Sequence, residues 1–202
     1  MNLFKRLFCK NKENGFKYVD LGLPSGTMWA TCNVGATRPE DSGLLFQFGR
    51  VDGYKYGDSN KFIKKTNIPT TTSGKTYKRY NLLELEDDAA HVHMAGKWKM
   101  PTYDQLKELL DNTTYEVKII NGVKGVLFIS NINGNQLFIP FAGCWYNGNF
   151  MAAGPRAYMW SSQVHTSDIN YAFGICCNSS GSAYISRYRR SCAFSVRGVF
   201  IK

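Results

Sequence analysis

Two Asn-Gly dipeptides, Asn121-Gly122 and Asn133-Gly134, each stand between two short apolar runs. Asparagine and glycine tolerate the positive φ angles of tight hairpin turns, so Asn-Gly is the most specific short signal for a β-hairpin. The runs that these turns separate cover residues 115–120, 125–130 and 136–139. This part of the chain is therefore predicted to form antiparallel hairpins.

The rest of the chain shows the same pattern of short strands and turns, and 202 residues suit one domain. Residues 102–111 have the clearest helical spacing of the main body, with Thr102 as N-cap and Gln105 at the reciprocal capping-box position. Residues 52–80 are expected to be a long loop. Further strands are expected at residues 16–21, 27–32, 44–48, 157–161, 170–176, 183–187 and 193–201.

The charge of the chain is strongly basic, with 25 lysines and arginines against 15 acids. A basic surface suits phosphate, an anionic glycan or an acidic protein, although it can equally be a solvated face that keeps the protein soluble. The run Glu84, Glu86, Asp87 and Asp88 is expected to be a solvated acidic turn. No recognised nucleic-acid-binding module is present, and no apolar run is long enough for a transmembrane segment.

Residues 1–15 are expected to be a separate docking segment, and residues 16–202 the main domain. The start of the chain alternates basic and apolar residues with helical spacing, which predicts one short amphipathic helix that ends at Asn14-Gly15. Such a short helix is not stable alone, so we expect it to bind a particle or scaffold protein, or an anionic surface. The apolar docking residues are Leu3, Phe4, Leu7 and Phe8.

Common catalytic and cofactor motifs are weak in this chain. The triplet 74–76 resembles the end of a phosphate loop, but Pro69 stands where that loop needs a glycine. His91 and His93 have no cysteine or carboxylate at metal-ligand spacing, so no metal and no cofactor is predicted. Six cysteines occur without a C-x-x-C pair, and we expect them to be reduced. No catalytic residue is predicted.

The last third of the chain has the composition of a binding surface. Tyrosine and tryptophan give large contact area at a small entropy cost, and Asn, Ser and Gly give adaptable hydrogen bonds. Aromatic rings with flanking amides also suit sugars, although many of these rings can equally fill a β-rich core. The predicted ligand-binding residues are Tyr146, Asn147, Asn149, Tyr158, Asn170, Tyr171, Asn178, Ser182, Tyr184, Tyr188 and Arg189.

Residues 18–36, YVDLGLPSGTMWATCNVGA, resemble the opening signature of the Fibrobacter succinogenes major paralogous domain. Blocks in the same order follow at residues 86–91 with 96–102, at 134–143, and at 160–162 with 194–197. The resemblance covers about residues 16–200 and implies an α+β, C-type-lectin-like domain with twisted antiparallel strands and one or two helices. In that arrangement the opening and closing strands pair, and three tryptophans inside the blocks belong to the core: Trp29, Trp98 and Trp160.

The resemblance also implies a function, because similar domains occur in surface-exposed bacterial proteins and in phage. The calcium-dependent sugar motifs of C-type lectins are absent. We therefore expect a non-enzymatic binding module, a phage virion decoration or receptor-binding protein that contacts a bacterial surface glycan or protein. A virion surface is the expected location, with a bacterial surface or the cytoplasm as alternatives, and a homotrimer is the expected assembly. The alternatives are a structural cap without a small ligand, a bacterial surface lectin-like protein and, less favoured, a sulfatase-modifying type of enzyme.

Overall fold

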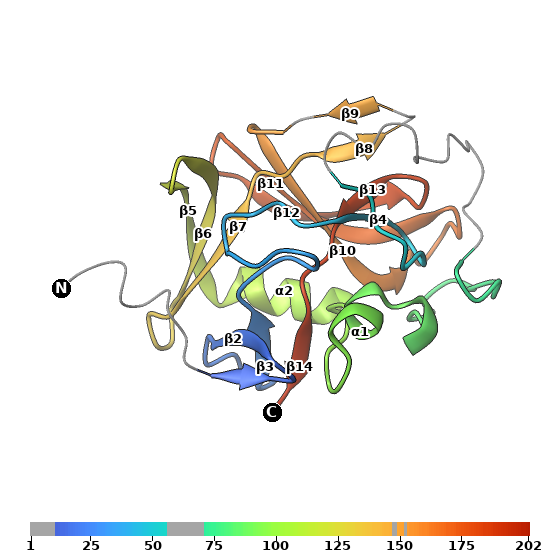
Figure 1. Cartoon of the computed structure of the whole chain (residues 1–202), viewed down its shortest axis with the longest axis horizontal. Helices are drawn as coiled ribbons and strands as arrows, with labels where there is room; N and C mark the ends of the chain where they lie inside the picture. The colour runs from blue at the N-terminus through green and yellow to red at the C-terminus, as the bar shows by residue number, and fades with distance from the viewer. Residues whose placement is uncertain (1–10, 56–70, 147–148, 152) are drawn as a thin grey trace.

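The computed structural model describes residues 11–55, 71–146, 149–151 and 153–202 (Figure 1). The described part of the chain is mostly β, with 43% of its residues in strands and 10% in helices, and the strands form several curled sheets. The expected α+β, C-type-lectin-like fold class is therefore wrong. The fold is mostly β because the strand period and the glycine turns recur along the chain, whereas helical spacing is confined to two short stretches.

The first sheet joins the two ends of the described chain. Its strands are β1 (Lys12–Glu13), β2 (Phe16–Asp20), β3 (Thr27–Ala30) and β14 (Val199–Ile201), in the order β1-β2-β3-β14. Figure 1 shows β2, β3 and β14 together beside the C-terminus. The expected pairing of the opening and closing strands is thus confirmed.

The described end of the predicted docking segment belongs to this sheet. Asn14 and Gly15 both have positive φ and turn β1 back onto β2, so they form a hairpin where the sequence predicted the end of a helix. The carbonyl oxygen of Glu13 also accepts a hydrogen bond from the indole of Trp98, at 2.9 Å. The docking residues Leu3, Phe4, Leu7 and Phe8 lie outside the described residues.

The second sheet contains the predicted antiparallel hairpins and forms a three-stranded meander. It consists of β5 (Thr113–Ile120), β6 (Val123–Ser130) and β7 (Gln136–Pro140) in chain order. Asn121 and Gly122, with φ of 48° and 81°, make the tight turn between β5 and β6. The predicted tight turn is confirmed there. Strands β6 and β7 also pair antiparallel across Asn133-Gly134, but the connection is longer and only Gly134 of the dipeptide has a positive φ.

The third and largest sheet carries most of the last third of the chain. Its strand order is β12-β11-β10-β13-β8-β9, and one further strand, β4 (Leu45–Gln47), also pairs with β13. Strand β13 is short but central, because it contacts β4, β8 and β10. The bounds of the other strands are β8 (Cys144–Tyr146), β9 (Asn149–Met151), β10 (Arg156–Val164), β11 (Tyr171–Asn178), β12 (Ala183–Arg189) and β13 (Ala193–Ser195).

Two short α-helices and one 3-10 turn complete the described fold: η2 (Leu85–Asp87), α1 (Ala89–Met94) and α2 (Tyr103–Asp111). The predicted capping box is confirmed at the start of α2, where Thr102 and Gln105 bond each other's backbone amides. The predicted acidic turn is only half right. Glu84 and Glu86 are exposed, but Asp87 is fully buried and Asp88 is 2% exposed. Asp88 is buried because it caps α1 and because both of its carboxylate oxygens accept the amide hydrogen of Met100.

The core consists of two large apolar clusters on either side of the largest sheet's β10 and β11. One cluster holds Trp160 and Phe194, and the other holds Met159 and Ile175 beside α2 and the meander. All three tryptophans assigned to the core, Trp29, Trp98 and Trp160, have no exposed surface.

Candidate functional site: a hollow lined by tyrosine and arginine

A hollow of about 660 Å³ opens on the largest sheet, where β8, β10, β12 and β13 come together. Its wall combines aromatic rings, arginines and two cysteines, and no described acid lines it. The lining residues are Cys144, Tyr146, Met151, Pro155, Arg156, Tyr158, Tyr171, Arg187, Tyr188, Arg189, Cys192 and Phe194.

Strand register explains why these side chains meet. Tyr158 pairs with Cys176, which in turn pairs with Tyr184, and side chains two residues apart share a face. Arg156 and Tyr158 of β10 therefore project on the same face as Tyr188 of β12. Tyr171, Arg187 and Arg189 belong to the alternate row, yet they also line the hollow, at the end of the sheet where β11 begins and β12 ends.

A glycine makes the close approach of two rings feasible. Gly174 lies in register between Trp160 and Ser186. A Cβ at Gly174 would lie 2.9 Å from the carbonyl oxygen of Met159, and about as close as normal contact to the rings of Tyr188 and Trp160. The missing side chain lets the Tyr188 ring lie across β11 toward β10.

The aromatic wall is packed into a rigid stack. Phe194 is stacked between Tyr158 and Trp160, with ring centroids 4.9 and 4.2 Å away. Tyr188 meets Tyr158 and Phe194 edge-on, at 5.6 and 5.0 Å. Such contacts fix the tyrosines in the absence of a ligand, so the wall is preorganised for binding.

The hydroxyl groups of several tyrosines lie close together at one end of this stack. Burial raises the pKa of the Tyr188 phenol, whose hydroxyl lies near the Cys176 thiol and the Tyr184 hydroxyl without a hydrogen bond of standard geometry to a described residue. The pKa of Tyr158 is also raised, mainly by burial, and its hydroxyl accepts a hydrogen bond from Nη1 of Arg156 at 3.1 Å. Both phenols are therefore neutral near physiological pH.

The two cysteines of the hollow are poor nucleophiles. Burial raises the pKa of both Cys144 and Cys192 to about 12. Because the thiolate is the reactive form of cysteine, both side chains act as small apolar groups near neutral pH.

Five of the eleven predicted ligand-binding residues line the hollow: Tyr146, Tyr158, Tyr171, Tyr188 and Arg189. Tyr184 shares the face of Tyr158 but lies outside the lining. Asn149 and Ser182 are exposed and also lie outside it. Asn147 lies outside the described residues.

Two of the predicted asparagines serve local structure. The side chain of Asn178 accepts hydrogen bonds from Ser180 and from the amide of Ser182, which closes the turn between β11 and β12. Asn170 donates both its amide and its side chain to Asp168. Their residue types fitted a binding surface, but in both cases the polar groups are engaged within a turn.

Sequence reasoning missed two arginines of the hollow. Arg156 stands two residues before Tyr158, so strand alternation from Tyr158 could have found it. Arg187 stands beside Tyr188 and was visible in the same basic run as Arg189. Cys144, Cys192 and Phe194 carried no local signal, because they enter the hollow through pairings of β8, β10 and β13 that are distant in the sequence.

The three histidines are separate and each has a local partner. His91 Nδ1 lies 3.2 Å from the carbonyl oxygen of Trp98, and His93 Nε2 lies 2.8 Å from that of Val51. His165 Nδ1 lies near Ser167. Within the described part of the chain, no group of three or more His, Cys, Asp or Glu side chains is placed to hold a metal ion.

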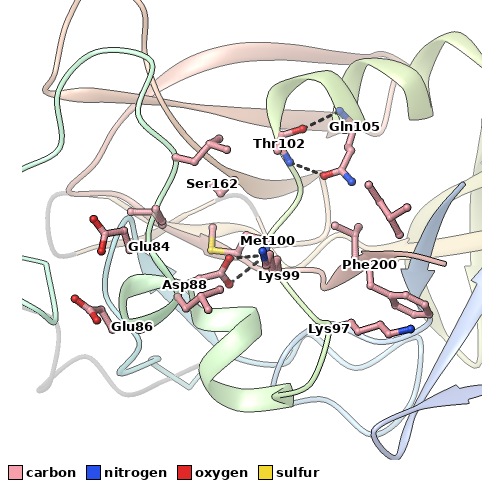
Figure 2. Close-up of a pocket in the computed structure, with 15 residues that line it drawn as sticks. Glu84, Glu86, Asp88, Lys97, Lys99, Met100, Thr102, Gln105, Ser162 and Phe200 are labelled. Atoms are coloured by element: carbon pink, nitrogen blue, oxygen red, sulfur yellow. Dashed lines mark hydrogen bonds between the residues drawn. The ribbon is translucent and has the colours of Figure 1, made fainter. Parts of the chain in front are cut away.

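A second hollow, of about 780 Å³, lies between the segment around η2 and strand β14 (Figure 2). Its carboxylates and its capping residues serve the local structure. Asp88 is engaged by the amides of His91 and Met100, and Thr102 and Gln105 by each other. Glu84 and Glu86 both pair with Lys75. We therefore take the tyrosine and arginine hollow as the candidate site.

No protein-family model, no curated protein and no solved structure matches this chain. None of the helices in the described ranges is long and apolar enough to cross a membrane. We therefore infer the function from the geometry of the hollow.

Proposed function

We propose that this protein is a non-enzymatic binding module whose ligand, a bacterial surface glycan or protein, sits in the tyrosine and arginine hollow. The observation that carries the proposal is the convergence of Tyr146, Tyr158, Tyr171, Tyr188 and Arg189 on one concave surface. These residues lie on β8, β10, β11 and β12, which bring together parts of the chain that are distant in the sequence.

The chemistry of the hollow supports binding over catalysis. Burial raises the pKa of the Tyr188 phenol and of the Cys144 and Cys192 thiols, which keeps these three groups neutral near physiological pH. The stacked rings are already in place without a ligand, so binding costs little side-chain entropy. The rim provides exposed apolar surface at Tyr146, which is 37% exposed, and at Met151, which is 47% exposed.

The proposal is tested with the labelled full chain on a printed array of bacterial surface polysaccharides and on intact bacterial cells. We expect binding that Tyr146→Ala weakens by roughly three- to tenfold, the cost of losing one ring contact. Tyr80→Ala is the matched control, because Tyr80 is 63% exposed and lies outside the hollow. Absence of binding to both probes, or equal loss in the two variants, would contradict the proposal.

A virion surface remains the setting that we propose for this module, and a homotrimer its assembly. Several weak sites on one particle gain strength through multivalency. Fractionation of released particles tests the location, and light scattering of the purified chain tests the assembly.

A further inference from the structure

The hollow has an unbalanced charge. Arg156, Arg187 and Arg189 line it, all three are exposed, and the lining contains no described carboxylate. Among the described residues, no ion pair involves any of the three. A neutral ligand would leave three positive charges around its binding site without a counter-charge.

The guanidinium groups are oriented but keep donors for a ligand. Arg156 gives Nη1 to the hydroxyl of Tyr158, which leaves its other N–H groups open toward solvent. Arg187 and Arg189 lie over the ring of Tyr171, at 5.3 and 5.9 Å from its centroid. A guanidinium over a ring is held by the ring face, so its N–H edge stays available.

Asp168 and His165 lie near Arg187, but neither forms an ion pair with it. Arg187 contributes to lowering the pKa of Asp168, although the larger causes are the amide and side-chain bonds from Asn170. Arg187 also contributes, after burial, to lowering the pKa of His165. His165 is therefore mostly neutral near physiological pH, and Asp168 is engaged within its own turn.

The remaining lining residues provide apolar surface on which a sugar ring of the ligand can pack. Tyr146, Met151 and Pro155 surround the hollow on the side of β8 and β9, and each offers apolar area next to the arginines. The C–H face of a sugar ring packs on such surfaces, whereas an extended acidic peptide does not need them. Stacked apolar surface beside guanidinium donors matches a molecule that is both a ring and an anion.

We propose that the ligand of this hollow is an acidic glycan, a sugar whose ring bears a carboxylate, sulfate or phosphate group. Acidic groups of the glycan would lie beside Arg156 at one end of the hollow and beside Arg187 and Arg189 at the other, and a sugar ring would pack toward Tyr146. This inference depends on the proposed binding function and specifies its ligand.

The test compares acidic glycans with neutral glycans of similar size by surface plasmon resonance of the full chain. The acidic probes are a uronic-acid polymer, a sulfated polysaccharide and a phosphate-bearing polysaccharide, and dextran and mannan are the neutral probes. Because the acidic probes cover all three anionic groups, the comparison also identifies which group is preferred. Arg156→Gln and Arg187→Gln are measured beside Arg79→Gln, which removes the same charge from an exposed position outside the hollow.

We expect at least one acidic glycan to bind roughly tenfold or more tightly than the neutral probes. A neutral glycan lacks the charged hydrogen bond to arginine, and such a bond contributes about 1.4 kcal/mol or more, which corresponds to this tenfold difference. Arg156→Gln and Arg187→Gln should each weaken this binding about tenfold, and Arg79→Gln should not change it. Raised salt should weaken the binding.

Three results would overturn the inference. Equal binding of dextran or mannan, unaffected by the arginine variants, would leave the binding function standing and remove the acidic ligand. Equal binding of polyglutamate or single-stranded DNA would show that charge alone is recognised, without a sugar. Absence of binding to every probe and to whole cells would remove the binding function itself, and the acidic ligand with it.

Discussion

Asp87 is a fully buried carboxylate whose direct partners in the described structure are all neutral. It accepts hydrogen bonds from the amide and the hydroxyl of Ser73, at 2.7 and 2.6 Å, and from the hydroxyl of Tyr77 at 2.6 Å. These bonds tie the segment around residue 73 to η2. A buried charge is tolerated only when such donors replace its water, so each donor matters for stability.

We predict that Tyr77→Phe destabilises the protein by about 1.5–3 kcal/mol at neutral pH, since it removes a hydrogen bond to a buried charge. Burial, and then the bond to Asp87, raises the pKa of Tyr77 to about 12. The folded state therefore favours the protonated phenol. Its stabilising contribution is complete below a pH of about 10, the unfolded pKa, and is lost as the pH rises toward about 12.

Urea unfolding of the wild-type chain and of Tyr77→Phe, at about pH 8 and about pH 11, measures this difference. The gap between the two proteins should shrink at the higher pH, because the variant has no phenol to ionise. Tyr80→Phe is the control, since Tyr80 is 63% exposed and its loss should stay within about 0.5 kcal/mol. A gap that is constant with pH would contradict the raised pKa.

At the residue scale, the sequence predicted chemical types better than roles. Asp87 was expected to be solvated because it stands in a run of four acids, and nothing local distinguishes it from the exposed Glu86. The difference arises from Ser73 and Tyr77, which fold over η2 from 14 and 10 residues away. Asn178 likewise fitted a binding surface by type but closes its own turn.

At the scale of elements, the predictions succeeded where the signal is local. The turn at Asn121-Gly122 and the capping box at Thr102 each depend on residues within a few positions, and both are confirmed. The fold class, which was taken from the resemblance rather than from these signals, is wrong. Counting the local strand signals alone would have given the β-rich answer.

The hairpin β5–β6 offers a test of two separate roles of glycine. Gly122 has a φ of 81° and nothing within 4 Å of the position of a Cβ, so Gly122→Ala introduces only backbone strain, about 1 kcal/mol. A Cβ on Gly125 would lie 2.4 Å from the carbonyl oxygen of Ile139 and 2.5 Å from the ring of Phe138. Gly125→Ala should therefore cost at least about 2 kcal/mol, because the obstacle includes backbone of β7.

Thermal and urea unfolding of both alanine variants measure these losses. The two substitutions add the same methyl group to one hairpin, so each controls for the other. Equal losses of stability would contradict the assignment of backbone strain to Gly122→Ala and of a steric clash to Gly125→Ala. A larger loss for Gly122→Ala would show that β7 moves away more easily than its hydrogen bonds to β6 indicate.

At the scale of the whole molecule, the hollow is a product of pairings that the sequence does not encode locally. Residues 144–146, 156–158 and 192–194 meet because the short β13 pairs with β8 on one side and β10 on the other. Strand order is decided by the packing of complete apolar faces, and no short motif records it. The sequence could therefore suggest candidate residues by chemical type but not which of them share one hollow.

Arg197 connects the three sheets. It follows β13, it is fully buried, and no carboxylate bonds it within the described structure. Its guanidinium instead donates to Oδ1 of Asn33 at 3.0 Å, to the carbonyl oxygen of Ala30 in β3 at 3.1 Å, and to that of Phe138 in β7 at 3.2 Å. Burial lowers its pKa to about 10, which still leaves it cationic near neutral pH.

We predict that both Arg197→Met and Arg197→Lys destabilise the whole domain by on the order of 3 kcal/mol or more, measured by urea unfolding. Methionine fills part of the volume but leaves three acceptors without a donor. Lysine keeps the charge but cannot reach three acceptors in different directions with one ammonium group. Because the acceptors lie on two sheets and the arginine beside a third, the loss should appear as one earlier, still single transition. Arg38→Lys, at an exposed ion pair, is the control and should change little. Full stability of Arg197→Lys would show that the charge matters and the planar geometry does not.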